Sequence, residues 1–155
     1  MLVRTRHFGE IELDKDKIIR FDNGILGFEN FKDYTLLYDD KEGEGPIISW
    51  LQNLEEPSLA LPVINPFLVM DDYNPEVEDE LLHSLGELRD DNIIVLVTIT
   101  VPSKVQDMTA NLKAPIIINS ETKKGCQIVA QNNDYEIKHQ IYNKLKALKE
   151  AKGVK

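Results

Sequence analysis

Short apolar segments rich in Val, Ile, Thr and Tyr recur along the chain, and Gly, Pro, Asn or Asp residues separate them. Period-two alternation, or a brief apolar run between turn residues, is typical of short strands. Tight hairpins are expected at His7–Glu10 and at Thr122–Gly125. The pattern predicts a mostly β fold of a single domain, a mostly antiparallel sandwich or barrel. Its strands should lie near residues 2–8, 9–13, 17–21, 34–39, 47–52, 59–64, 67–72, 93–101, 108–119 and 125–131.

One interruption of the strand pattern begins at Pro75. The proline and the acids that follow it suit a helix N-terminus, and apolar residues then recur at helical spacing. We therefore expect a short helix whose acidic residues face solvent. Its apolar face would carry Val77, Leu81 or Leu82, Leu85 and Leu88.

The end of the chain repeats this periodicity. Ile137, Ile141, Leu145 and Leu148 follow one another at spacings of four, four and three, which indicates a docked or peripheral C-terminal helix. Lysines occupy its later turns, where the helix dipole favours cations. We divide the chain into a barrel domain over residues 1–135 and a basic helical tail over 136–155, and we expect residues 41–46 to form a loop between strands.

Charge is unevenly distributed along the 155 residues. The chain has 27 acidic and 18 basic side chains, a formal charge of -9. Residues 71–91 hold nine acids and one base, a charge of -8, whereas residues 135–155 hold six bases and two acids, a charge of +4. This acidity opposes direct binding to nucleic acid or to an anionic membrane, because both are negatively charged. A basic partner protein is the more plausible ligand.

Residues able to support catalysis or bind a metal are sparse. The single Cys126 cannot form an internal disulfide, and the histidines, His7, His83 and His139, lack metal-ligand spacing. The Gly24–Gly27 segment matches no phosphate-binding motif, so we interpret it as a structural turn. The acids at 71–72 and 78–80 lack the order of an EF-hand loop, and we interpret them as a solvated face or a docking face for a basic protein. We expect no enzyme activity and no cofactor.

The N-terminus becomes charged within a few residues and lacks the apolar stretch of a secretory signal. The apolar runs elsewhere are far shorter than the roughly 20 residues that cross a bilayer. These features predict a cytoplasmic protein.

Three ordered segments carry a family resemblance that composition does not show. Residues 18–37, 48–73 and 101–129 contain NGILGF, INPF and TANLKAP in this order. The chain resembles the flagellar assembly factor FliW over nearly its whole length, to about Tyr135. The resemblance implies a small barrel-like cytoplasmic protein without enzymatic activity. It also implies two mutually exclusive partners, flagellin and the dimeric RNA-binding regulator CsrA, which represses flagellin translation.

The resemblance and the charge together suggest which residues contact a partner. Turn-forming residues in the same segments, such as Asn65, Pro66, Asn111 and Pro115, could instead simply fix bends of the chain. A second class of function also stays open, a small-molecule-binding or catalytic barrel, which a deep pocket lined by histidines and carboxylates would favour. The candidate partner-binding residues are Phe67, Asp71, Asp72, Tyr73, Glu76, Val101, Pro102, Asn111 and Leu112.

Overall fold

The computed structural model describes residues 1–38 and 47–151, so residue 39 of a predicted strand and the predicted loop at 41–46 lie outside the described residues. Strands dominate these parts of the chain, with 3₁₀ turns at Lys15–Lys17, Pro66–Leu68, His83–Leu85 and Val105–Asp107. The helices are α1 (Asp79–Leu82) and α2 (Tyr142–Ala151). The strands are β1 (Leu2–Arg4), β2 (Glu10–Glu12), β3 (Ile19–Arg20), β4 (Asp33–Leu37), β5 (Ile48–Asn53), β6 (Ala60–Ile64), β7 (Ile93–Thr100), β8 (Thr109–Ala110), β9 (Ile116–Asn119), β10 (Lys124–Gln127) and β11 (His139–Gln140).

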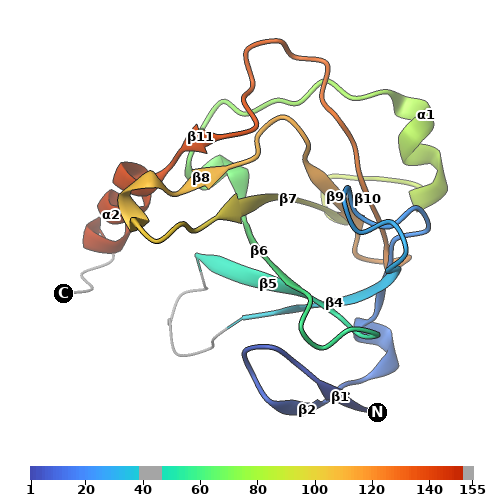
Figure 1. Ribbon diagram of the computed structural model, residues 1–155. Coiled ribbons are helices and arrows are strands. Elements are labelled where there is room, and N and C mark those ends of the chain that lie inside the picture. The colour runs from blue at the N-terminus through green and yellow to red at the C-terminus, as the bar shows by residue number, and fades with distance from the viewer. Residues whose placement is uncertain (39–46, 152–155) are drawn as a thin grey trace.

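Seven strands close into a barrel in the order β7-β6-β5-β4-β3-β10-β9, and β9 pairs again with β7 (Figure 1). The neighbours are antiparallel except β3 and β10, which run parallel. The far end of β7 also pairs with β8, and β8 pairs with β11. The hairpin of β1 and β2 forms a separate sheet at one end of the barrel. The predicted mostly β, barrel-like fold with short helices is confirmed.

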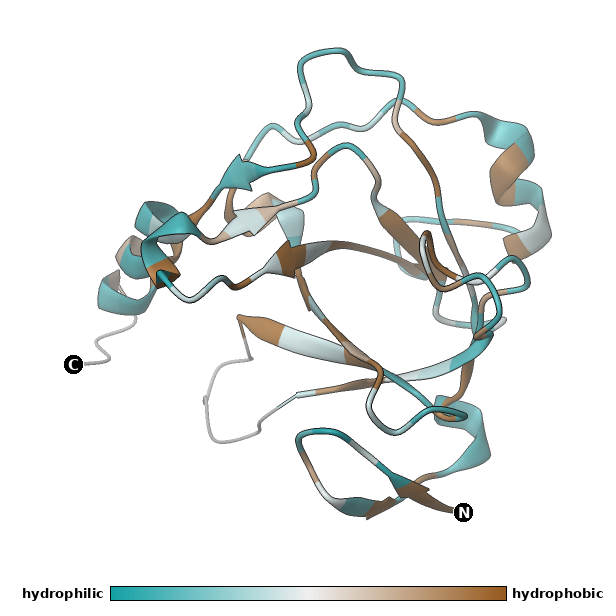
Figure 2. Ribbon diagram, viewed as in Figure 1, coloured by the Kyte–Doolittle hydropathy of each residue, from teal (hydrophilic) through white to brown (hydrophobic). Residues whose placement is uncertain are grey.

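Two hydrophobic clusters lie on opposite faces of β7, because alternate residues of a strand point to opposite sides. Leu96 packs in the barrel cluster with Phe21, Leu51 and Ile116. Val97 and Ile99 belong to the second cluster, outside the barrel. Figure 2 shows the corresponding hydrophobic colouring of the barrel strands, while α2 is mostly hydrophilic.

The tail contributes to the second cluster. Ile141 is 1% exposed and Leu145 is 6% exposed, and β11 joins the sheet through β8. Ile137, the first residue of the predicted apolar series, is exposed instead. The division of the chain at residue 135 stays a prediction. The helices α1 and α2 lie on opposite sides of the molecule (Figure 1), so α2 does not cover the acids of α1.

The predicted strand at 67–72 is wrong. Pro66 cannot donate a backbone hydrogen bond, and the Asn65 side chain accepts one from the Phe67 amide at 3.0 Å. The chain therefore turns in a 3₁₀ conformation at Pro66–Leu68 instead of extending. The long strand predicted at 108–119 is broken for a similar reason, since the Asn111 side chain accepts hydrogen bonds from the amides of Lys113 and Ala114 and separates β8 from β9.

The helix predicted from Pro75 is shorter than its pattern suggests. Only Asp79–Leu82 is α-helical, and the following 3₁₀ turn ends at Gly86, whose φ is 86°. The segment before Asp79 stays out of the helix, because the backbone of Asn74 and Glu76 is hydrogen bonded to residues 131–135. Both predicted hairpins form, but their connections are residues 5–9 and 120–123, which begin two residues earlier than predicted. Gly9 has φ 66° in the first connection and Lys123 has φ 58° in the second.

Candidate functional site

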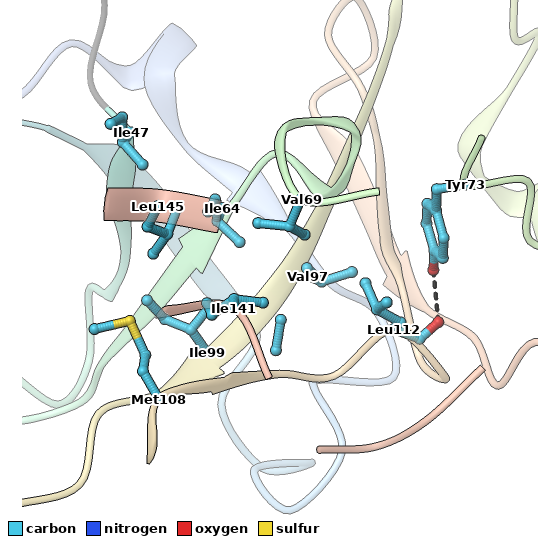
Figure 3. Close-up of a cluster of buried hydrophobic side chains, with 11 residues drawn as sticks. Ile47, Ile64, Val69, Tyr73, Val97, Ile99, Met108, Leu112, Ile141 and Leu145 are labelled. Carbon is cyan, nitrogen blue, oxygen red and sulfur yellow. Dashed lines mark hydrogen bonds between the residues drawn. The ribbon is translucent and has the colours of Figure 1, made fainter. Parts of the chain in front are cut away.

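Tyr73 lies at the centre of the first group of predicted partner residues, and it is buried. Its side chain is 3% exposed, and its hydroxyl donates a 2.7 Å hydrogen bond to the carbonyl of Leu112, which is itself 0% exposed (Figure 3). Burial, followed by the neighbouring Tyr135, raises the pKa of Tyr73. The rings of Phe67 and Tyr135 flank it, with centroids 6.0 and 4.9 Å away. These residues form what we call the Tyr73 centre: Phe67, Tyr73, Leu112 and Tyr135.

Only part of the Tyr73 centre can meet a partner directly. Tyr73 and Leu112 are inaccessible, whereas the Phe67 side chain is 44% exposed. Asn111 is half-buried, and its side-chain oxygen already accepts two backbone hydrogen bonds from the turn that follows. The alternative that turn residues simply fix bends of the chain thus accounts for Asn111, whereas Tyr73 and Leu112 belong to the core and Phe67 keeps an exposed apolar face.

Asp71, Asp72 and Glu76 are exposed. The Tyr73 amide donates to the Met70 carbonyl at 3.1 Å, so the two aspartates occupy the middle of a tight turn and project from it. Asp71, Asp72 and the acids at 76 and 78–80 form no ion pair with a residue of the described ranges. Together these six carboxylates make up the acidic stretch of residues 71–80.

The backbone of the acidic stretch is tied to residues 131–135. The Glu76 amide donates to the Asn132 side chain at 2.6 Å, and the Gln131 amide donates to the Glu76 carbonyl at 2.7 Å. The Asn74 amide donates to the Tyr135 hydroxyl at 2.7 Å. These bonds hold the segment extended with its carboxylates directed to solvent, and they explain why helix formation starts only at Asp79.

Val101 and Pro102 belong to a separate part of the surface, the connection from β7 to β8. Val101 is 51% exposed and Pro102 is half-buried. The structure therefore brings Phe67, Tyr73 and Leu112 together, with the acids on the adjoining turn, but it does not place the β7–β8 connection in the Tyr73 centre.

Three surface cavities of the described residues bear on the site. One, of about 430 Å³, lies between the β1–β2 hairpin and β4, and a second, of about 370 Å³, is lined by Phe28, Phe31 and Leu59. The third, of about 130 Å³, lies between the Gly24–Gly27 turn, α1 and β10. No histidine lines any of the three, and the described residues contain no cluster of three or more His, Cys, Asp or Glu side chains suited to a metal.

Two exposed leucines line the third cavity, and neither was predicted to be exposed. Leu26 is 52% exposed at the tip of the glycine turn, and Leu81 is 49% exposed on α1. Of the two leucines proposed for the buried helix face, Leu82 is the half-buried one. No local signal singles out Leu26, because the neighbouring Ile25 also lies between the two turn glycines and is 2% exposed. No helix in the described part of the chain is long and apolar enough to cross a membrane.

Comparisons with known proteins agree over most of the chain. The family model described as "FliW protein" matches residues 2–141. A flagellar assembly factor FliW of Lachnoclostridium phytofermentans is 55% identical over 144 residues, covering 93% of this chain and 92% of the relative. The FliW of Lachnospira eligens is 52% identical over 147 residues, covering 94% and 97%. A crystal structure of the flagellar assembly factor FliW superposes with a TM-score of 0.82 at 31% identity, covering 91% of this chain and 96% of that one.

Proposed function

Because the chain belongs to the FliW family of flagellar assembly factors, we propose that it is a non-enzymatic regulator that binds flagellin and, in exchange, the translational regulator CsrA. Binding to CsrA antagonises its hold on RNA and relieves repression of flagellin translation. Flagellin retained in the cytoplasm occupies this protein and restores repression. The proposed location is the cytoplasm, where both partners are synthesised and the message is read.

The observation that supports the CsrA interaction is the exposed, unpaired acidic stretch of residues 71–80. Its six carboxylates lack an ion-pair partner among the described residues, so their field is not cancelled locally. A protein that holds RNA must be basic where it contacts phosphates. Opposite charges accelerate encounter and fix orientation, so a basic partner would dock with this stretch facing it.

The same field supplies a mechanism for antagonism. A dense group of carboxylates docked beside an RNA-binding surface repels phosphate over roughly one Debye length, about 8 Å at physiological salt. Displacement of RNA therefore does not require that this protein cover the RNA site. High salt should weaken both docking and displacement, because the charges involved are exposed.

A gel-shift assay with CsrA bound to a flagellin leader RNA tests this proposal. The wild-type chain should release the RNA, and the quadruple variant D71K/D72K/E76K/E78K should not, because the sign of its field is reversed. The backbone bonds of Glu76 do not involve its side chain, so the fold should be retained. Unchanged displacement by this variant would rule out the acidic stretch as the source of antagonism.

The matched control changes total charge by the same amount at other exposed acids. The variant E10K/D14K/D16K/D107K reverses four carboxylates that are all exposed and lie outside the acidic stretch. It should displace RNA as the wild type does. If both quadruple variants fail equally, net charge and not the placement of the acids controls displacement.

A further inference from the structure

The cavity beside α1 is a short groove with an apolar floor. The glycine turn, α1 and β10 meet there, and the exposed leucines 26 and 81 lie on two of its sides. Its volume is about 130 Å³. We call it the Leu26–Leu81 groove, and it is lined by Asn23, Gly24, Leu26, Glu29, Leu81, Cys126, Gln127 and Ile128.

The turn that presents Leu26 is tightly constrained. Gly24 has φ +67° and packs against the backbone of Glu29, so that a Cβ at Gly24 would lie 2.6 Å from the Glu29 Cα. The Leu26 amide donates to the Gln127 side chain at 2.9 Å, and the Gly27 amide donates to the Glu29 carboxylate at 2.8 Å. Leu26 is thus held exposed by a fixed backbone, which lowers the entropy that a partner must remove on binding.

The opposite side of the groove is also anchored. The Leu85 carbonyl, at the end of the 3₁₀ turn that follows α1, accepts hydrogen bonds from the Asn119 side chain and the Thr122 hydroxyl, both at 2.8 Å. These contacts attach α1 to the β9–β10 hairpin, whose strand β10 supplies the floor of the groove. Leu26 and Leu81 are therefore held at a fixed separation before a ligand binds.

Charge around the groove has one sign. Glu29 lines it, Asp79 and Glu80 immediately precede Leu81 on α1, and all three residues are exposed. No lysine or arginine lines the groove.

We propose that the Leu26–Leu81 groove is a docking site for a cationic protein segment that inserts one aliphatic side chain between Lys or Arg residues. A cavity of about 130 Å³ suits one side chain, because an engineered cavity of about 150 Å³ accepts a ligand the size of benzene. An amphipathic helix would instead need a longer groove for anchors at successive turns. This proposal rests on the proposed function and assigns the segment to the basic partner, CsrA.

The groove and the acidic stretch contribute to the proposed complex in different ways. The acidic stretch supplies long-range attraction and repulsion of phosphate, whereas the groove supplies the short-range apolar contact that fixes the complex. Phe67 and the β7–β8 connection do not line this groove and stay available to another ligand.

Calorimetric titration of the full chain with purified CsrA tests the assignment. The variant L26S/L81S should raise the Kd at least about tenfold, as expected when apolar anchors at the centre of an interface are removed. Both leucines are about half exposed, so the variant should fold normally. The control L2S/I137S changes two residues that are each 64% exposed elsewhere, and its Kd should stay within about twofold of wild type.

The outcomes separate this inference from the function on which it rests. If wild type binds CsrA and L26S/L81S binds within about twofold of it, the groove is not the docking site, and the proposed function stands. If wild type does not bind CsrA, the proposed function fails and the assignment fails with it. A second readout is alkylation of Cys126 at pH 9, which saturating CsrA should slow if the groove is filled, whereas an unchanged rate would overturn the assignment.

Discussion

The Tyr73 centre and the Leu26–Leu81 groove adjoin opposite ends of the acidic stretch, and they use apolar residues in opposite ways. In the Tyr73 centre the ring is 3% exposed and its hydroxyl is bonded to a backbone carbonyl. In the groove, Leu26 and Leu81 are 52% and 49% exposed on rigid supports. The first arrangement stabilises the fold, and the second leaves apolar surface exposed that a partner can bury on binding.

This difference shows that residues within a recognisable motif need not be the residues that touch a ligand. Tyr73 and Leu112 lie in two of the three segments that carry the family resemblance, but they join the segment after β6 to the turn between β8 and β9. Under the proposed function they act on a partner only indirectly, through the placement of Phe67 and of the acids beside them. Substitutions in the Tyr73 centre should mainly change the free energy of unfolding, whereas substitutions in the groove should mainly change the affinity for a partner.

The largest effect is expected for Tyr73→Ala. Removing a buried aromatic side chain leaves a cavity and an unpaired carbonyl at Leu112, and should lower the free energy of unfolding by about 3–5 kcal/mol. Tyr73→Phe removes only the hydroxyl and should cost about 0.5–1.5 kcal/mol. Urea denaturation followed by the fluorescence of Trp50 measures both. A loss below 1 kcal/mol for Tyr73→Ala would contradict the assignment of Tyr73 to the core.

The overall fold could be predicted from the chain because strand patterning is local. Alternation or short apolar runs within β4, β5, β6 and β7 and the hairpin residues around Gly9 sufficed for a mostly β sandwich or barrel, and the family resemblance favoured the barrel. Closure of the barrel was not predictable from these patterns, because it depends on β9 pairing with both β7 and β10. The strand predicted at 67–72 does not form, because the Asn65 side chain accepts the hydrogen bond of the Phe67 amide, which is then not available to a neighbouring strand.

The candidate site was less predictable because exposure is a property of the assembled fold. Charge located the acidic stretch, since unpaired carboxylates must remain in water. Nothing local distinguishes Tyr73, which is buried, from Phe67, which is partly exposed, because the difference arises from packing against Leu112 and Tyr135. Leu26 was treated only as part of a turn, because its neighbour Leu81 comes from a distant segment.

The second prediction concerns the floor of the groove. Burial raises the pKa of the Cys126 thiol from 9.0 to about 11. At pH 8 the thiolate fraction is then about 100-fold lower than in the unfolded chain, because two pKa units change the ratio by that factor. Alkylation by iodoacetamide should be slower by at least this factor in the folded protein, and urea should abolish the difference. Equal rates would mean that Cys126 is open to water, and that the groove has no apolar floor.

The third prediction compares two glycines of similar φ. Gly24→Ala forces a left-handed conformation on a residue with a Cβ and drives that atom into the backbone of Glu29, whereas Gly9→Ala meets nothing within 4 Å. Gly24→Ala should cost about 1–3 kcal/mol or distort the turn, and Gly9→Ala only about 1 kcal/mol. If Leu26 needs this turn, only Gly24→Ala should also weaken CsrA binding in the titration used for L26S/L81S. Equal affinities for the two alanine variants would show that the turn need not be rigid.

The smallest effect should come from Glu121, which neutralises Arg89 at the far end of the acidic residues 71–91. A hydrogen bond from Asn92, followed by the one from Arg89, lowers the pKa of Glu121 below its usual value of 4.5. Because the folded-state pKa is depressed, the stabilisation is present above the unfolded-state pKa and is lost as pH falls through the folded-state pKa. The exposed site limits its size. Wild type should therefore have a slightly higher urea midpoint than Glu121→Gln at pH 7, and the two should converge near pH 3.

The parallel comparison with Glu78→Gln, whose carboxylate has no ion pair with the described residues, should show no midpoint difference at pH 7. A loss equal to that of Glu121→Gln would mean that the acids of the stretch stabilise the fold and are not free to act on a partner.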